Sequence, residues 1–151
     1  MQMMEATGAF RSIDDVAEAL PARVAVLTRL FLKRTGISRM EAGVLAAAAG
    51  GPQRITALAE REGCTQPAIT RLVDRLQARG WVVREPDSDD GRVVLVALTA
   101  DGREVADRLR RAYREMLHGE MIKLAEEDVR VLARAIEVLD ELIAGLREPH
   151  R

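Results

Sequence analysis

Residues 55–99 read ITALAEREGCTQPAITRLVDRLQARGWVVREPDSDDGRVVLVALT. The first half of this stretch has the apolar spacing of two short amphipathic helices with a glycine between them. The second half holds two runs of β-forming residues around a dense cluster of turn residues. This order predicts a helix, a tight turn, a second helix and a two-stranded hairpin.

The second predicted helix has the clearest signal. Its apolar residues recur at i, i+3, i+4 and i+7 and share one face: Ile69, Leu72, Val73 and Leu76. Thr65 stands ahead as an N-cap whose hydroxyl we expect to accept a backbone N–H, and Pro67 falls in the first turn. Gly80 follows, where a left-handed residue would close the helix.

The outer face of this helix is polar and mainly cationic. It carries Gln66, Pro67, Ala68, Thr70, Arg71, Asp74, Arg75 and Arg79. In the preceding helix, Leu58 and Ala59 are the predicted inward residues and Thr56 the predicted cap. Gly63 supplies the turn into Cys64. Two short helices joined in this way are typical of a helix-turn-helix whose second helix enters a DNA major groove.

The predicted hairpin has strands at residues 81–83 and 93–98 around the turn residues 86–91. Arg92 stands at its tip, and we expect the carboxylate of Asp90 to hold the Arg92 guanidinium. An arginine on a projecting hairpin suits the narrow minor groove of DNA. Taken alone, the segment would be an ordinary solvated turn. Its position after a helix-turn-helix favours a wing.

The chain resembles the multiple antibiotic resistance regulator (MarR) family of winged-helix transcription factors. The resemblance lies in Leu58-Ala59-Glu60, in residues 69–76 with Gly80, in Asp90-Gly91-Arg92, and in Leu98-Thr99 with Gly102. Gly91 stands where many members have a second basic residue, and Trp81 replaces a smaller aliphatic one. The resemblance implies a DNA-binding homodimer.

The predicted DNA contacts form three groups. The recognition helix contributes Thr65, Gln66, Pro67, Ala68, Thr70, Arg71 and Arg75. The wing contributes Asp90, Gly91 and Arg92. The candidates for contact with the DNA backbone are Arg54, Arg79 and Arg84.

Composition limits the class of protein. The chain has 151 residues, 48% hydrophobic and 31% charged, with no apolar run long enough to span a membrane and no secretory signal in residues 1–11. We therefore expect a cytoplasmic protein whose residues 1–11 are disordered or extended. One cysteine cannot form an internal disulfide, and we expect Cys64 to be a small buried apolar side chain rather than a redox sensor.

The charge balance at first argues against a DNA-binding protein. The net charge is −1, whereas proteins that neutralise phosphates without sequence specificity are basic. Between Arg54 and Arg92, seven arginines face seven acidic residues. The placement of arginines on the second helix and the wing is what favours DNA, so we expect moderate affinity and strong salt sensitivity.

The flanking segments read as helices. Residues 13–33 form a long helix capped by Ser12, in which we expect Pro21 to cause a kink or a restart. Ser38 is the predicted cap of a helix that runs to about Ala49, and Thr99 caps the next one. The fold class is therefore mainly α with a small β component (α+β): a winged helix-turn-helix with a two-stranded wing, flanked by terminal helices.

The last helix carries an apolar seam at spacings of three and four residues. Together with Val16 and Leu20 of the first long helix, the seam gives the predicted dimerisation residues, Val129, Leu132, Ile136, Leu139 and Ile143. Periodicity alone leaves open whether the seam packs within one subunit or between two. The resemblance implies the latter and a pseudo-palindromic operator. Residues 34–99 are then the DNA-binding region, and residues 12–33 and 100–147 the dimerisation region.

The sequence predicts neither catalysis nor a cofactor. No nucleophile with its base, phosphate loop or metal-ligand spacing is visible, and His118 and His150 lack partners at such spacing. The resemblance implies a small aromatic or anionic effector, for which no residues are assigned. We expect a ligand-responsive transcriptional repressor. The alternative is a winged helix that contacts another protein and not DNA.

Overall fold

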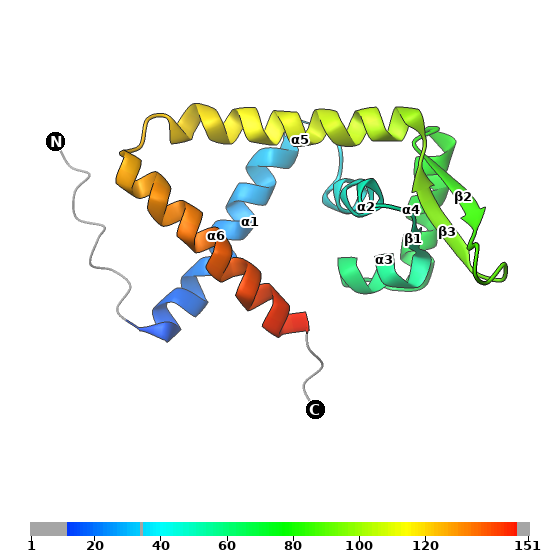
Figure 1. Cartoon of the computed structure of the whole chain (residues 1–151), viewed down its shortest axis with the longest axis horizontal. Coiled ribbons are helices and arrows are strands. Elements are labelled where there is room, and N and C mark those ends of the chain that lie inside the picture. Colours follow the sequence, from blue (N-terminus) through cyan, green and yellow to red (C-terminus); the bar gives the residue numbers. More distant parts are fainter. Residues whose placement is uncertain (1–11, 34, 148–151) are drawn as a thin grey trace. The chain divides into compact units, whose positions relative to one another are not determined.

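The computed structural model describes residues 12–33 and 35–147. It contains the helices α1 (Ile13–Lys33), α2 (Arg39–Ala49), α3 (Ile55–Glu62), α4 (Gln66–Ala78), α5 (Ala100–Met121) and α6 (Glu126–Arg147), and the strands β1 (Gln53–Arg54), β2 (Val82–Pro86) and β3 (Val94–Leu98) (Figure 1). The chain divides after Leu109 into two units, which are described separately. The expectation for residues 1–11, and the boundary residue 34, lie outside the described residues.

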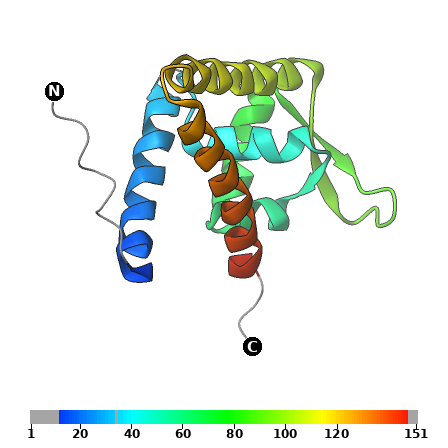
Figure 2. The same ribbon diagram turned by 60° about the vertical axis from the view of Figure 1, so that its left-hand side comes forward.

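The helices α2, α3 and α4 and the sheet form the core of the first unit (Figure 2). The predicted stripe of α4 is confirmed, since Ile69, Leu72, Val73 and Leu76 are all at most 1% exposed. The core also includes Leu45, Leu58 and Val96, together with Val105 and Leu109 of α5. The fold class is that of a mainly helical winged helix, as the sequence predicts.

The helix-turn-helix owes its shape to two left-handed glycines. Gly63 and Gly80 have φ angles of 62° and 74° and follow the ends of α3 and α4. After each glycine the next amide reaches back to the helix: the N–H of Cys64 donates to the carbonyl of Ala59, and that of Trp81 to Leu76, both at 3.0 Å. This pattern satisfies carbonyls that the helix end would otherwise leave unpaired. Cys64 itself is only half-buried, so the expectation of a buried side chain was wrong.

The two predicted threonine caps have different outcomes. Thr65 occupies the N-cap of α4, as predicted, but its hydroxyl makes no capping bond, so the expected bond was wrong. Pro67 has no N–H to offer, and the N–H of Ala68 donates to the Thr65 carbonyl at 3.0 Å instead. Thr56 lies inside α3, because Arg54 of β1 leads straight into that helix.

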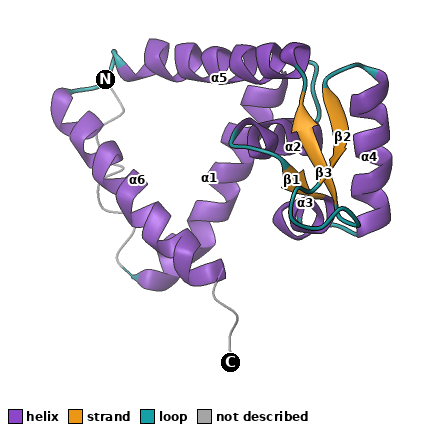
Figure 3. Cartoon of the chain, turned by 45° about the vertical axis from the view of Figure 1, so that its right-hand side comes forward, coloured by secondary structure: helices purple, strands orange, loops and turns teal. Residues whose placement is uncertain are grey.

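The sheet has one strand more than the predicted wing. The wing strands β2 and β3 pair antiparallel from Val82 opposite Leu98 to Pro86 opposite Val94. The two-residue strand β1 pairs with the other edge of β3, which gives the order β1-β3-β2 (Figure 3). Two residues are too few to show an alternating pattern, so β1 escaped prediction.

The flanking helices begin as predicted. Ser12 caps α1 through the amide of Asp15, and Ser38 caps α2 through the amide of Glu41. Helix α1 runs through Pro21 as one element, so the restart was wrong, while the alternative of a kink at Pro21 stays a prediction. Proline removes one backbone bond there, and the bonds of the following turns keep the helix intact.

The start of α5 shows why Gly102 follows Thr99 by three residues. Thr99 caps α5 by accepting the N–H of Gly102 at 3.0 Å, while its own hydroxyl donates to the carbonyl of Gly80 at 2.6 Å. These bonds bring α5 against the turn that follows α4. A Cβ added to Gly102 would lie 1.8 Å from the carbonyl oxygen of Trp81. Only glycine fits this contact between backbones.

Gly102→Ala should therefore destabilise the first unit. We expect a loss of about 1–3 kcal/mol or more in the free energy of unfolding, because the obstacle is backbone that cannot turn aside. Urea unfolding followed by circular dichroism measures this loss. Gly119→Ala on the same helix is the matched control, since no described atom lies within 4 Å of the added Cβ. Equal stability of the two variants would contradict the prediction.

The second unit contains the end of α5 and all of α6. Helix α6 has no buried residue, and its predicted seam is open: Leu132 is 39% exposed and Ile136 57%. Its charged side chains pair along the helix, as Arg130 does with Glu126 and Arg134 with Glu137. Among the described residues, no helix combines the length and apolarity needed to cross a bilayer.

Candidate nucleic-acid interface

Helix α4 presents three distinct faces. The first is the buried stripe that contacts the core. The second, formed by Thr70, Asp74 and Gln77, lies beside β2 and receives bonds from it. The third carries Pro67, Arg71 and Arg75, all exposed. Their spacing of four residues places these three side chains in one row along the helix.

The N-terminal end of α4 is hollowed on its outer side. Gln66, Pro67, Thr70 and Arg71 line an open depression of about 450 Å³. Four of the predicted recognition residues are therefore gathered in one place. An amide and a guanidinium are the groups that read adenine and guanine edges in the major groove.

The cations of the third face have few bonds to the protein. Arg75 donates to the carbonyl of Arg71 at 3.5 Å, which leaves most of its donors open. The guanidinium of Arg71 has no hydrogen bond or ion pair with residues 12–33 or 35–147. Both arginines are thus available to a ligand.

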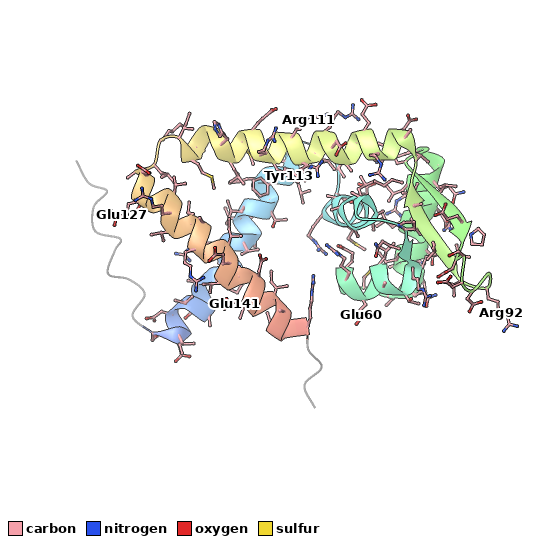
Figure 4. All side chains as sticks on the ribbon, viewed as in Figure 1. Glu60, Arg92, Arg111, Tyr113, Glu127 and Glu141 are labelled. Carbon is pink, nitrogen blue, oxygen red and sulfur yellow. The ribbon has the colours of Figure 1, made fainter. Side chains whose placement is uncertain are left out.

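The wing tip is organised by its carboxylates. Asp90 accepts the backbone N–H of Arg92 at 3.1 Å, so the prediction that it holds the Arg92 guanidinium was wrong. A carboxylate bonds the amide two residues ahead in an Asx turn, and this short loop satisfies that preference first. The Arg92 side chain is exposed and points away from the hairpin (Figure 4). It has no ion pair within the described part of the chain.

Asp87 anchors the base of the same loop. It accepts the N–H of Asp89 at 2.9 Å and pairs with Arg54 of β1 at 3.0 Å. The bond from the Asp89 amide, followed by that from Arg54, lowers the pKa of the Asp87 carboxyl. The Asp87 carboxylate thus stays charged and keeps Arg54 occupied.

Each predicted DNA-backbone candidate has a carboxylate partner. Besides the Arg54 pair, Arg79 bonds Glu41 at 3.2 Å and lies 4.8 Å from the centre of the Trp81 ring. Burial raises the pKa of Glu41, but its bonds from Ser38 and the charge of Arg79 outweigh burial and lower the pKa overall. Arg84 pairs with Asp74 at 2.7 Å. The assignment of these three arginines to DNA remains a prediction, and each would have to share or leave its partner.

Comparison with known proteins agrees with this arrangement. Residues 35–93 match the family model described as "MarR family". The winged helix of this chain belongs to the MarR family. An uncharacterized HTH-type transcriptional regulator of Mycobacterium leprae is 38% identical over 87 residues, which is 58% of this chain and 61% of that relative. The match thus spans about three fifths of the relative's length.

Solved structures extend the likeness to the flanking helices. The transcriptional regulator BldR of Sulfolobus solfataricus superposes with a TM-score of 0.61 at 29% identity, over 85% of this chain and 92% of that one. NadR, solved in complex with 4-hydroxyphenylacetate, superposes with a TM-score of 0.69 over 97% of this chain and all of its own. At 24% identity, NadR supports the MarR-family fold and no more.

Proposed function

We propose that this MarR-family chain is a sequence-specific DNA-binding transcriptional regulator. The observation that carries the proposal is the pair of open cations on separate elements, Arg71 on α4 and Arg92 on the wing. Cations without internal partners are the groups that phosphates and base edges attract. The description of the Mycobacterium leprae relative as a transcriptional regulator supports the same function.

In this function α4 lies in the major groove and the wing reaches the adjacent minor groove. The hollow formed by Gln66, Pro67, Thr70 and Arg71 receives base edges, and Thr65, Ala68 and Arg75 flank it. Residues 34–99 are the DNA-binding region of the proposal. Residues 12–33 and 100–147 are its dimerisation region.

The proposed regulator works as a homodimer. Val16 of α1 is 49% exposed, and Ile136 and Ile143 of α6 are 57% and 43% exposed. Apolar rows left open on long helices favour pairing with a second copy, which buries them. Two recognition helices about 34–36 Å apart would then read a pseudo-palindromic operator.

The proposed output is repression relieved by a small ligand. A dimer bound across a promoter blocks polymerase without further contacts. The complex of NadR with 4-hydroxyphenylacetate favours an aromatic acid as the class of effector. Such a ligand acts only if it binds two dimer geometries with unequal affinity.

A gel-shift titration against the DNA that flanks this gene tests the proposal. Arg71, Arg75 and Arg92 give three open cations per subunit, or six per dimer, so the slope of log Kd against log salt should be at most about 5, the value reached if each of them also neutralises a phosphate. If Arg54, Arg79 and Arg84 left their partners to bind phosphates, the slope would be about 11. A panel of aromatic acids in the same assay tests the ligand response.

The alternative is a winged helix that contacts another protein. The net charge of −1 favours it, because such a contact needs no basic surface. A protein-contact module would show no salt-dependent shift of any promoter fragment, whereas the proposed regulator must show one.

A further inference from the structure

Arg84 of β2 binds one face of α4 at three points. One terminal nitrogen donates to Asp74 at 2.7 Å and to the carbonyl of Thr70 at 3.5 Å. The other nitrogen donates to the side-chain oxygen of Gln77. Thr70, Asp74 and Gln77 are four and three residues apart, so the guanidinium spans two turns of the helix.

The planar guanidinium makes this contact directional. Its donors have fixed angles, so bonds to three points on one helix constrain both the position of that helix along the strand and its rotation. The Arg84 side chain is 26% exposed, against 55% for Arg54 and 47% for Arg79. Arg84 is thus the most enclosed of the three arginines that the sequence assigns to the DNA backbone.

We propose that Arg84 is a positioning residue that sets the rotation of α4 relative to the wing, and not a phosphate contact. This inference rests on the proposed function, since α4 is the helix that would read bases. Arg71 follows Thr70 and Arg75 follows Asp74, so a rotation of α4 moves the reading row together with the row that Arg84 holds. Base readout needs side chains placed to within about 0.5 Å.

The proposal also gives Asp74 a role. Its side chain is 59% exposed on a helix that would face a polyanion, where a carboxylate by itself weakens DNA binding. As the anchor of Arg84, the same carboxylate is required for specific binding. If Asp74 only repelled DNA, Asp74→Asn would tighten operator binding. If Asp74 anchors Arg84, the same substitution weakens operator binding.

Three variants separate positioning from phosphate contact. Asp74→Asn removes the negative charge that anchors Arg84 and leaves only a neutral acceptor. Arg84→Lys keeps the charge without the planar fork, and Arg84→Met removes the charge while it keeps the aliphatic stem. Glu60→Gln is the matched control, because Glu60 is an exposed carboxylate on α3 without a bond or ion pair to the described residues. Circular dichroism confirms that each variant is folded.

The first readout is affinity for the operator and for a scrambled duplex, each at several salt concentrations. We expect Asp74→Asn and Arg84→Lys to lower the ratio of the two affinities about tenfold, the size of one misread base contact. The salt slope of Arg84→Met should equal that of the unmodified protein. Tighter operator binding by Asp74→Asn would overturn the proposal, as would a slope that falls by about 1.8 in Arg84→Met, which marks two lost phosphate contacts per dimer.

The second readout needs no DNA. Amide hydrogen exchange in the free protein should be about fivefold faster along α4 in Asp74→Asn and Arg84→Lys, and unchanged in Glu60→Gln. Unchanged exchange along α4 in both variants would overturn the proposal even if DNA binding is confirmed. If the unmodified protein binds no DNA, the proposed function fails, and the exchange measurement still decides whether Arg84 holds α4.

Discussion

Replacing Arg71 with alanine should weaken specific operator binding at least about thirtyfold, in a protein that keeps its fold and its proposed dimeric state. Arg71 is exposed and lines the hollow at the start of α4, and its guanidinium has no partner among the described residues. An arginine that reads a guanine contributes about 1–3 kcal/mol of discrimination. The proposed dimer carries two copies of Arg71, so the expected loss is about 2–6 kcal/mol of operator affinity.

The measurement is a gel shift or fluorescence anisotropy titration with operator and scrambled duplexes. Arg130→Ala is the matched control, because Arg130 is an exposed arginine of α6 whose partner is Glu126. It should keep operator affinity within about threefold, since exposed ion pairs contribute little. If Arg71→Ala lost affinity for both duplexes equally, Arg71 would contact phosphates and not bases.

The local features of the fold were predictable because they depend on neighbours in sequence. The stripe of α4 follows from helical spacing, and Gly63 and Gly80 from the need for left-handed residues after a helix. The capping bonds of Ser12, Ser38 and Thr99 span three residues each. Each of these signals lies within a single turn or element.

The ion pairs were not predictable in the same way. Arg54 and Asp87 are 33 residues apart, and Arg79 and Glu41 are 38 apart, so no local pattern joins them. The sequence places these arginines near the proposed DNA surface but does not say what holds them. Only the folded structure, which brings Glu41 to Arg79 and Asp87 to Arg54, shows that these cations already have partners.

These ion pairs also explain how a chain of near-neutral net charge can present a cationic surface. Between positions 54 and 92, seven arginines and seven acidic residues give a net charge of zero. In the fold, Glu41, Asp74 and Asp87 each occupy one arginine. Of the other four, Arg61 lies exposed on α3, and Arg71, Arg75 and Arg92 remain open on α4 and the wing, where they form a small cationic surface.

The substitution Ile136→Glu should convert the proposed dimer to monomers. Ile136 lies in the middle of the α6 seam and is 57% exposed in the single chain. A glutamate there would bury one unpaired carboxylate per subunit in an apolar interface, at a cost of several kcal/mol. Sedimentation equilibrium at micromolar concentration should then give the chain mass of 16.7 kDa in place of twice that value.

The matched control for this experiment is Arg134→Glu. It places the same side chain on the charged face of α6, where Arg134 pairs with Glu137 in solvent. Arg134→Glu should remain dimeric and bind its operator. Ile136→Glu should bind only single half-sites, because a monomer lacks the gain in affinity that comes from linking two half-site contacts in one dimer. A dimeric Ile136→Glu variant would show that the α6 seam lies outside the subunit interface, and the dimer would then have to form through other residues.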